Sequence, residues 1–118
     1  PALTRLCPCG TLRRGPVTRH PSEADTFLGE TQTVPHYRLL DLGWYPGLAT
    51  VENNGRSISG ELWEVSPQRL QKLDAYEGDE YARQPVTLLD HNFNTTTETY
   101  VLKAPDWTRP DAGTMWAG

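Results

Sequence analysis

The sequence predicts an α+β protein, a small mixed β-barrel of six or seven short strands with one main flanking helix. Glycine and proline number 10 each among 118 residues, and so many turn-forming residues divide the chain into short elements. Short apolar runs between turns are typical of strands, whereas only one segment has clear helical spacing. We expect one domain over residues 1–118, since this length suits a single core, with an irregular tail over about 105–118.

The first half of the chain is predicted to form short strands. The first candidate covers residues 3–9, although Pro8 removes one backbone donor from it. A glycine-bounded loop over 10–16 and one helical turn over 21–25 follow. The next strands are expected at 26–31, 36–41 and 48–51, with a turn over 43–47 before the last of them.

The segment Asn53-Asn54-Gly55 is a strong hairpin signal, because Asn and Gly accept the positive φ of tight turns. Residues 57–65 are predicted to return from it as a strand, and residues 81–90 and 95–103 to form the last two strands. Because side chains alternate along a strand, residues 57–65 have two faces: Ile58, Gly60, Leu62 and Glu64 on one, and Glu61, Trp63 and Val65 on the other.

The predicted helix follows Ser66. Ser66 is a candidate N-cap, Pro67 suits the first helical position, and Gly78 is expected to end the helix as its C′ residue. Apolar side chains recur at helical spacing between these ends: Leu70, Leu73 and Tyr76.

Glu77 is the carboxylate that stands out on this helix. It lies seven residues after Leu70, and therefore within about 20° of it around the helix axis, on the side that faces the protein. Burial and the negative end of the helix dipole both raise the pKa of such a carboxyl. General acid–base catalysis at neutral pH needs a group of this kind. The alternative is a half-exposed helix-end Glu bonded to the next loop.

Asp74 lies on the same helix face, about 40° from Leu70. Its side chain is shorter than that of Glu77. We therefore expect it to order a neighbouring loop by accepting backbone N–H groups, rather than to be a second catalytic carboxylate.

The two cysteines, Cys7 and Cys9, are separated only by Pro8. Because alternate residues of a strand point to opposite faces, we expect both thiols to be unpaired. The histidines have no metal-ligand spacing relative to them, so no metal is expected. A redox protein is a minor alternative, since no neighbouring basic charge or helix start lowers the pKa of either thiol.

The net charge and the hydropathy of the chain limit the classes of binding partner that we expect. The net charge is −4, which gives no basic footprint for a nucleic acid. No apolar run approaches the ~20 residues that span a bilayer, and no signal peptide opens the chain. We expect a soluble, cytoplasmic protein with a small-molecule substrate and no nucleic-acid or membrane partner.

The loop Gly10-Thr11-Leu12 can aim consecutive backbone N–H groups at one point, which suits a carboxylate or a developing oxyanion. Tyr45 lies between Trp44 and the rigid Pro46-Gly47 step, and is predicted to help shape a pocket. Alternatively, Trp44 and Tyr45 only close the end of the barrel.

Four blocks occur in the order and spacing of the gamma-glutamylcyclotransferase-like family: CGTLRRG, YRLLDLGWYPGL, SGELWEV and LDAYEGDEYAR. The chain resembles its small bacterial branch, which includes gamma-glutamylamine cyclotransferase and the butirosin-type enzyme, over about residues 6–89. The resemblance implies a small mixed barrel with flanking helices. It implies that Glu77 is the general acid/base, that Gly10, Thr11 and Leu12 bind substrate, and that Tyr81 lines the pocket.

The predicted function is that of a metal-free gamma-glutamyl cyclotransferase without a cofactor. The glutamyl α-amine attacks its own γ-amide carbonyl and releases 5-oxoproline and a free amine. The alternative is a non-catalytic binding module of the same fold that recognises a gamma-glutamyl or 5-oxoproline group. It is motivated by Cys7-Pro8-Cys9, which stands where the family has an apolar strand that ends in Tyr.

Overall fold

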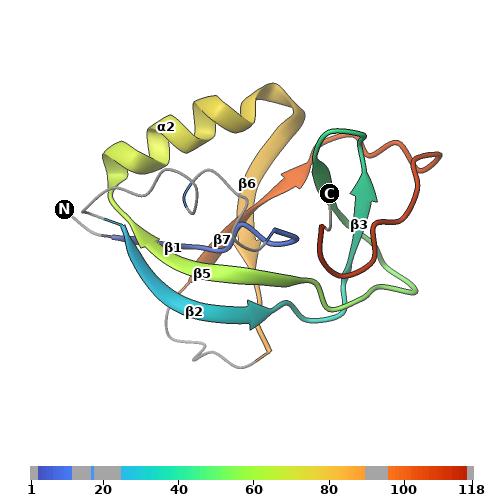
Figure 1. The fold of residues 1–118 in the computed structure, drawn as a ribbon, viewed down its shortest axis with the longest axis horizontal. Coiled ribbons are helices and arrows are strands. Elements are labelled where there is room, and N and C mark those ends of the chain that lie inside the picture. The colour runs from blue at the N-terminus through green and yellow to red at the C-terminus, as the bar shows by residue number, and fades with distance from the viewer. Residues whose placement is uncertain (1–2, 12–16, 18–24, 90–95, 117–118) are drawn as a thin grey trace.

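The structure is a computed structural model that describes residues 3–11, 17, 25–89 and 96–116. Its longer helix and all of its strands except β4 are labelled in Figure 1. In chain order the elements are β1 (Thr4–Leu6), β2 (Thr26–Gln32), β3 (Tyr37–Asp41), β4 (Pro46–Thr50), β5 (Ser59–Val65), α2 (Pro67–Glu77), the 3₁₀ turn η1 (Gly78–Glu80), β6 (Tyr81–Val86) and β7 (Thr97–Leu102).

The strands form two sheets. One has five strands in the order β2-β5-β1-β7-β6, and the other pairs β3 with β4. Strand β1 is antiparallel to β5 and parallel to β7, so the larger sheet is mixed. Helix α2 runs along one side of the strands, and β3 lies at the other end of the molecule (Figure 1). The predicted α+β class is confirmed, with seven strands in the described part of the chain.

The two outer strands of the large sheet, β2 and β6, are joined just beyond their ends. Thr33 forms an antiparallel bridge with Leu88, and the Val34 N–H donates to the Thr87 carbonyl at 3.0 Å. Because these bonds connect opposite edges, the sheet curls round and its edges meet, as a barrel requires.

Strand β5 shows where a local turn signal failed. Asn54 has the positive φ of 59° that the turn signal predicts, but β4 pairs with β3, while β5 lies between β1 and β2. The predicted hairpin between β4 and β5 is therefore wrong. Strand β5 pairs with β1 and β2, which are distant in the sequence, and a local turn signal at residues 53–55 carries no information about such long-range partners. Its predicted faces are confirmed, since Ile58 and Leu62 lie in one core cluster and Trp63 and Val65 in another.

Helix α2 begins and ends where predicted. The Ser66 Oγ accepts the Arg69 N–H at 3.1 Å, Pro67 is the first helical residue, and Gly78 follows the last one. Leu70 and Leu73 are buried against the core, but Tyr76 is 70% exposed, which contradicts its predicted place on the apolar face. Tyr76 lies about 120° from Leu70 around the axis.

The cysteines differ from the prediction, because Cys7 and Cys9 form a disulfide with their Cα atoms 5.1 Å apart. Strand β1 ends at Leu6, so the alternation that would separate the two side chains does not extend to them. Both cysteines are buried in the core beside Gly60, where an added Cβ would lie 2.8 Å from the Cys7 Sγ. Gly60 thus leaves the space that this bridge occupies.

The C-terminal tail is irregular in the described residues, and it packs against the rest of the molecule. Thr114 accepts the Ser59 N–H at 2.9 Å, and the Trp116 N–H donates to Gly10 O at 2.7 Å. The predicted helical turn over 21–25 and most of the loop over 10–16 lie outside the described residues. The last two predicted strands are shorter than expected, and Thr95 is outside the description.

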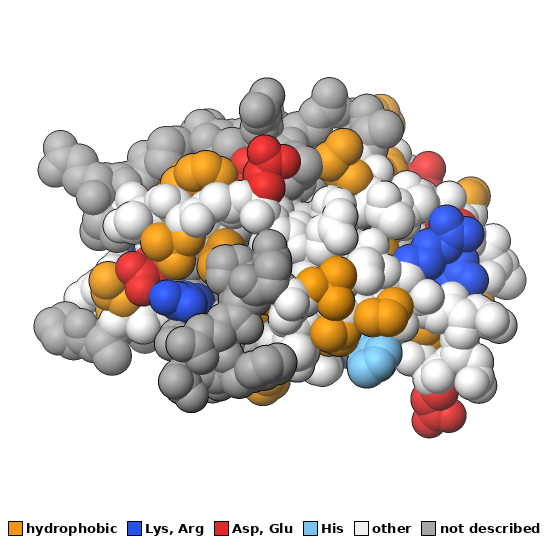
Figure 2. Space-filling view, turned by 90° about the horizontal axis from the view of Figure 1, so that it is seen from below, with side chains coloured by type: hydrophobic (Ala, Val, Ile, Leu, Met, Phe, Trp, Pro, Cys, Tyr) orange, Lys and Arg blue, Asp and Glu red, His pale blue; other side chains and the backbone are white. Residues whose placement is uncertain are grey.

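The face of the molecule in Figure 2 carries both charged and hydrophobic side chains. On the face in Figure 2, Lys and Arg side chains lie in separated groups with hydrophobic side chains between them. The described part of that face therefore carries no continuous basic band. No helix in the described ranges is long and apolar enough to cross a membrane.

Candidate active site

Glu77 is the last residue of α2 and is half-buried. Its position between Leu70 and Leu73 on the helix face, about 20° from Leu70, turns it toward the core. Burial, and to a smaller extent the negative charge of Glu80, raises the pKa of its carboxyl from 4.5 to about 7. Such a carboxyl is present in both protonation states near neutral pH, as a group that both takes and returns a proton must be.

Two tyrosines and a second carboxylate surround this helix end. The Tyr81 hydroxyl donates to the Pro46 carbonyl at 2.9 Å, and the Tyr45 hydroxyl donates to Glu80 Oε2 at 2.9 Å. Burial raises the pKa of Tyr81, and the charges of Glu77 and Glu80 add to this effect. The structure thus gathers Glu77, Tyr45 and Tyr81, three of the predicted site residues, around η1.

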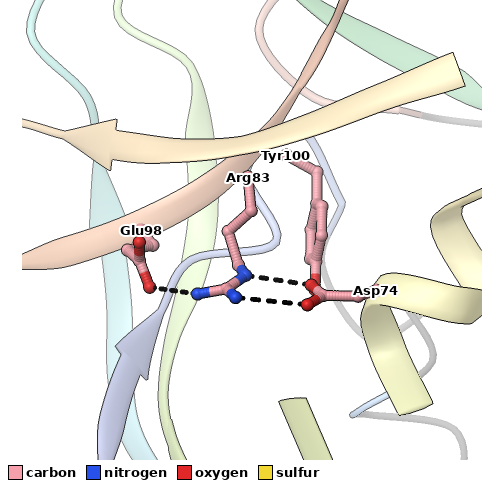
Figure 3. A network of polar contacts seen from close by, with 4 residues as sticks. All are labelled: Asp74, Arg83, Glu98 and Tyr100. Carbon is pink, nitrogen blue, oxygen red and sulfur yellow. Dashed lines mark hydrogen bonds and ion pairs between the residues drawn. The ribbon is translucent and has the colours of Figure 1, made fainter. Parts of the chain in front are cut away.

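Asp74, one turn before Glu77, anchors the helix to the sheet (Figure 3). Arg83 on β6 makes two hydrogen bonds to its carboxylate, Nε to Oδ1 at 2.9 Å and Nη2 to Oδ2 at 3.1 Å. The Tyr100 hydroxyl on β7 donates to Oδ1 at 2.6 Å, and Arg83 Nη1 also reaches Glu98 Oε1 at 2.6 Å. Asp74 has the expected structural role, but its partners are side chains of two strands rather than the backbone of a loop.

The contacts of Asp74 give the two carboxylates of α2 different pKa values. Burial alone would raise the pKa of Asp74, but hydrogen bonds from Arg83 and Tyr100 and the Arg83 charge lower it. Asp74 therefore stays ionised at neutral pH, whereas Glu77 titrates there. A pair of carboxyls with divergent pKa values is typical of acid–base sites. The charge of Glu77 also acts on Tyr100, whose pKa is raised mainly by burial.

Sequence reasoning missed Arg83, Glu98 and Tyr100. Glu98 and Tyr100 lie two residues apart and therefore on one face of β7, and Arg83 is the direct cross-strand partner of Tyr100. Finding them would have required the pairing register of β6 and β7, which the sequence alone did not supply.

The loop predicted to bind substrate is arranged differently from the expectation. The Gly10 N–H donates to Ser59 O at 2.7 Å, and the Thr11 N–H and hydroxyl both donate to Pro8 O, at 3.3 and 3.1 Å. The prediction that these two amides donate hydrogen bonds into a site is therefore wrong, because both already donate to backbone carbonyls. Leu12 lies outside the described residues.

Gly10 itself has a packing reason to be glycine. Its φ is 96°, and an added Cβ would lie 2.5 Å from the Leu39 Cδ1. Leu39 pairs with Leu48 across β3 and β4, two residues from the Pro46 carbonyl that holds Tyr81. The loop and Tyr81 therefore lie against the same two-stranded sheet.

In the described ranges no group of three or more His, Cys, Asp or Glu side chains is placed to hold a metal ion.

The family model described as gamma-glutamyl cyclotransferase, AIG2-like, matches residues 8–117. The chain belongs to this family. A Vibrio cholerae protein provisionally named a gamma-glutamylcyclotransferase is 41% identical over 68 residues, which is 58% of this chain and 56% of that protein. An Arabidopsis thaliana protein with the same provisional name is 38% identical over 101 residues, 75% of this chain and 53% of the relative. The chain thus spans a little over half the length of these curated relatives.

Solved structures agree with the family assignment. The crystal structure of a protein specific to uropathogenic E. coli superposes with a TM-score of 0.77 at 19% identity, covering 98% of this chain and 94% of the other. An AIG2-like protein from Mus musculus has a TM-score of 0.71 at 26% identity, with coverages of 94% and 86%. The first shows a shared fold, and the second is a structural neighbour inside the family.

Proposed function

We propose that this chain is a gamma-glutamyl cyclotransferase that cleaves a small gamma-glutamyl amide and forms 5-oxoproline. The observation that carries the proposal is Glu77, a half-buried carboxyl at the end of α2 whose pKa is raised to about 7. Membership of the family supports the same reaction class.

In the proposed reaction the ionised Glu77 takes a proton from the substrate's α-ammonium group. The freed amine attacks the γ-carbonyl carbon, which forms the C–N bond of a five-membered ring and a tetrahedral oxyanion. Collapse of this intermediate breaks the original amide C–N bond, and Glu77 returns its proton to the departing nitrogen. The ring nitrogen still carries one surplus proton, which passes to the released amine, so that the amine departs as an ammonium ion. Atoms balance without water, since the amide becomes 5-oxoproline and a free amine.

The protein's contribution is mainly proton transfer and placement. Nucleophile and carbonyl belong to one molecule, so much of the entropic advantage of proximity is already present in the substrate. The contacts of Asp74 with Arg83 and Tyr100 hold the last turn of α2 against β6 and β7. Glu77 therefore acts from a fixed helix end rather than from a loop.

We propose that Tyr45, Tyr81 and the loop Gly10-Thr11-Leu12 surround the glutamyl group. Tyr81 lies near Glu77, since the charge of Glu77 adds to the effect of burial in raising the pKa of Tyr81. Gly10 contributes shape rather than a donor in this proposal, since its N–H is bonded to Ser59.

The test is Glu77→Gln, with release of 5-oxoproline measured across a panel of gamma-glutamyl amides. Glutamine keeps the shape of the side chain but accepts no proton, so we expect turnover to fall by about 10²–10⁴-fold. Asp79→Asn is the matched control, because it removes an exposed carboxylate two residues away and should leave turnover unchanged.

A Gln variant as fast as the wild type would remove Glu77 from the mechanism. Binding of the amides without 5-oxoproline release by the wild-type protein would favour a non-catalytic binding module instead.

A further inference from the structure

Two hydrogen bonds join η1 and the first residue of β6 to the turn before β4, and we call this pair the η1 clamp. One runs from the Tyr45 hydroxyl to Glu80 Oε2 and the other from the Tyr81 hydroxyl to the Pro46 carbonyl, each at 2.9 Å. Neighbouring residues 80 and 81 thus contact neighbouring residues 45 and 46. The clamp fixes the segment that directly follows Glu77.

Glu80 is an exposed residue that is nevertheless fixed at two points. Its carbonyl accepts the Lys103 N–H at 3.0 Å, and its side chain accepts the Tyr45 hydroxyl. An exposed hydrogen bond of this kind adds little to folding stability, because water competes for both partners. Its main effect is to restrict where the Glu80 carboxylate lies.

We propose that Glu80 is a positioning residue of the Glu77 site, held by Tyr45 so that a second negative charge stays beside Glu77. The inference rests on the proposed role of Glu77 as general acid/base. It gives the Tyr45 hydroxyl a task other than contact with substrate, since that hydroxyl is committed to Glu80.

Electrostatics supports this placement. A like charge nearby disfavours ionisation of a carboxyl, and the charge of Glu80 does raise the pKa of Glu77, after the larger effect of burial. Among the described residues, the charge of Glu77 in turn raises the pKa of Tyr81 on β6 and of Tyr100 on β7. Asp74, one turn earlier, is ionised, and its negative charge is balanced by an ion pair with Arg83.

Two substitutions separate the charge of Glu80 from its hydrogen bond. Glu80→Gln removes the charge and keeps an oxygen that accepts the Tyr45 hydroxyl. Tyr45→Phe keeps the charge and removes the donor that holds it. Asp79→Asn is the control, because it removes a neighbouring charge of the same 3₁₀ turn, whereas the Tyr45 hydroxyl donates to Glu80.

The readout is the titration midpoint of the Glu77 side-chain carboxyl, followed by ¹³C NMR without substrate, together with the acidic limb of the pH profile for 5-oxoproline release. We expect Glu80→Gln to lower the midpoint by roughly half a pH unit, and Tyr45→Phe to lower it by a smaller amount. Asp79→Asn should shift it by less than either.

An unchanged midpoint in Glu80→Gln, or an equal shift in Asp79→Asn, would overturn the role of Glu80. An unchanged midpoint in Tyr45→Phe would overturn the role of Tyr45. If the midpoint shifts as expected but 5-oxoproline release does not depend on Glu77, then the general acid/base role fails while the placement of Glu80 stands.

Discussion

Ionisation of Glu77 near neutral pH, where its proposed chemistry takes place, lowers the free energy of unfolding. Its folded-state pKa is raised to about 7 from 4.5, so between these values the folded protein binds more protons than the unfolded chain. The free energy of unfolding therefore falls as pH rises through this window. Each pKa unit corresponds to about 1.4 kcal/mol, which sets an upper bound of about 3 kcal/mol on the loss.

Glu77→Gln should remove this pH dependence. At pH 4.5 we expect the variant and the wild type to unfold at similar urea concentrations, because the wild-type carboxyl is then mostly protonated. At pH 8 the variant should be the more stable protein, by up to about 3 kcal/mol. Urea titrations at both values measure the difference, with Asp79→Asn as the control. Equal stability at pH 8 would mean that the folded protein bears no penalty for ionised Glu77.

At the scale of the element, the end of α2 depends on an unusual backbone conformation. Gly78 has φ 75° and ψ −163°, and its N–H donates to the Asp74 carbonyl. This combination lies outside the left-handed helical region that Asn also adopts, in a region that is essentially restricted to glycine. The predicted helix stop is right in position, but its geometry sends the chain directly into η1.

Gly78→Ala and Gly78→Asn should therefore be similarly destabilising, by about 1–3 kcal/mol. No atom lies within 4 Å of a Cβ added at Gly78, so the cost comes from the backbone and not from a steric clash. Thermal and urea unfolding of both variants measure it. Near-normal stability of the Asn variant would contradict the assigned conformation.

The elements also show which features a sequence reveals. The helix was predictable because its signals, Ser66, Pro67 and Gly78, act on their own neighbours. Glu77 was predictable for the same reason, since its direction follows from helix geometry. The pairing of β5 was not, because the turn at Asn54 determines only a local bend, while the partners β1 and β2 lie far away in the sequence. Arg83 and Tyr100 were missed because they meet Asp74 only after three elements have packed together.

At the scale of the whole molecule, Thr33 connects the closure of the barrel to its interior. Its side chain is fully buried. The Thr33 Oγ1 donates to the Val34 carbonyl at 2.8 Å and accepts the Ile58 N–H at 3.0 Å. The Thr33 hydroxyl thus satisfies the buried Ile58 N–H of the segment that leads into β5. It does so at the point where the edge strands β2 and β6 meet.

Thr33→Val keeps the shape of the side chain but leaves the Ile58 N–H without this acceptor. We expect the free energy of unfolding to fall by about 1–3 kcal/mol and the Ile58 amide to exchange its hydrogen faster. Thr26→Val, at an exposed position of the same strand region, should change stability little. Equal effects of the two substitutions would show that the loss is not specific to barrel closure.

The η1 clamp has two halves that respond differently to evolutionary change. Tyr81 binds a main-chain carbonyl, which every residue at position 46 would offer, so sequence drift there preserves the bond. Tyr45 binds a side chain, so a change at either 45 or 80 breaks the contact unless the other changes with it. Substitutions at positions 45 and 80 can therefore change the electrostatics beside Glu77, while the bond from Tyr81 keeps the backbone of this region in place.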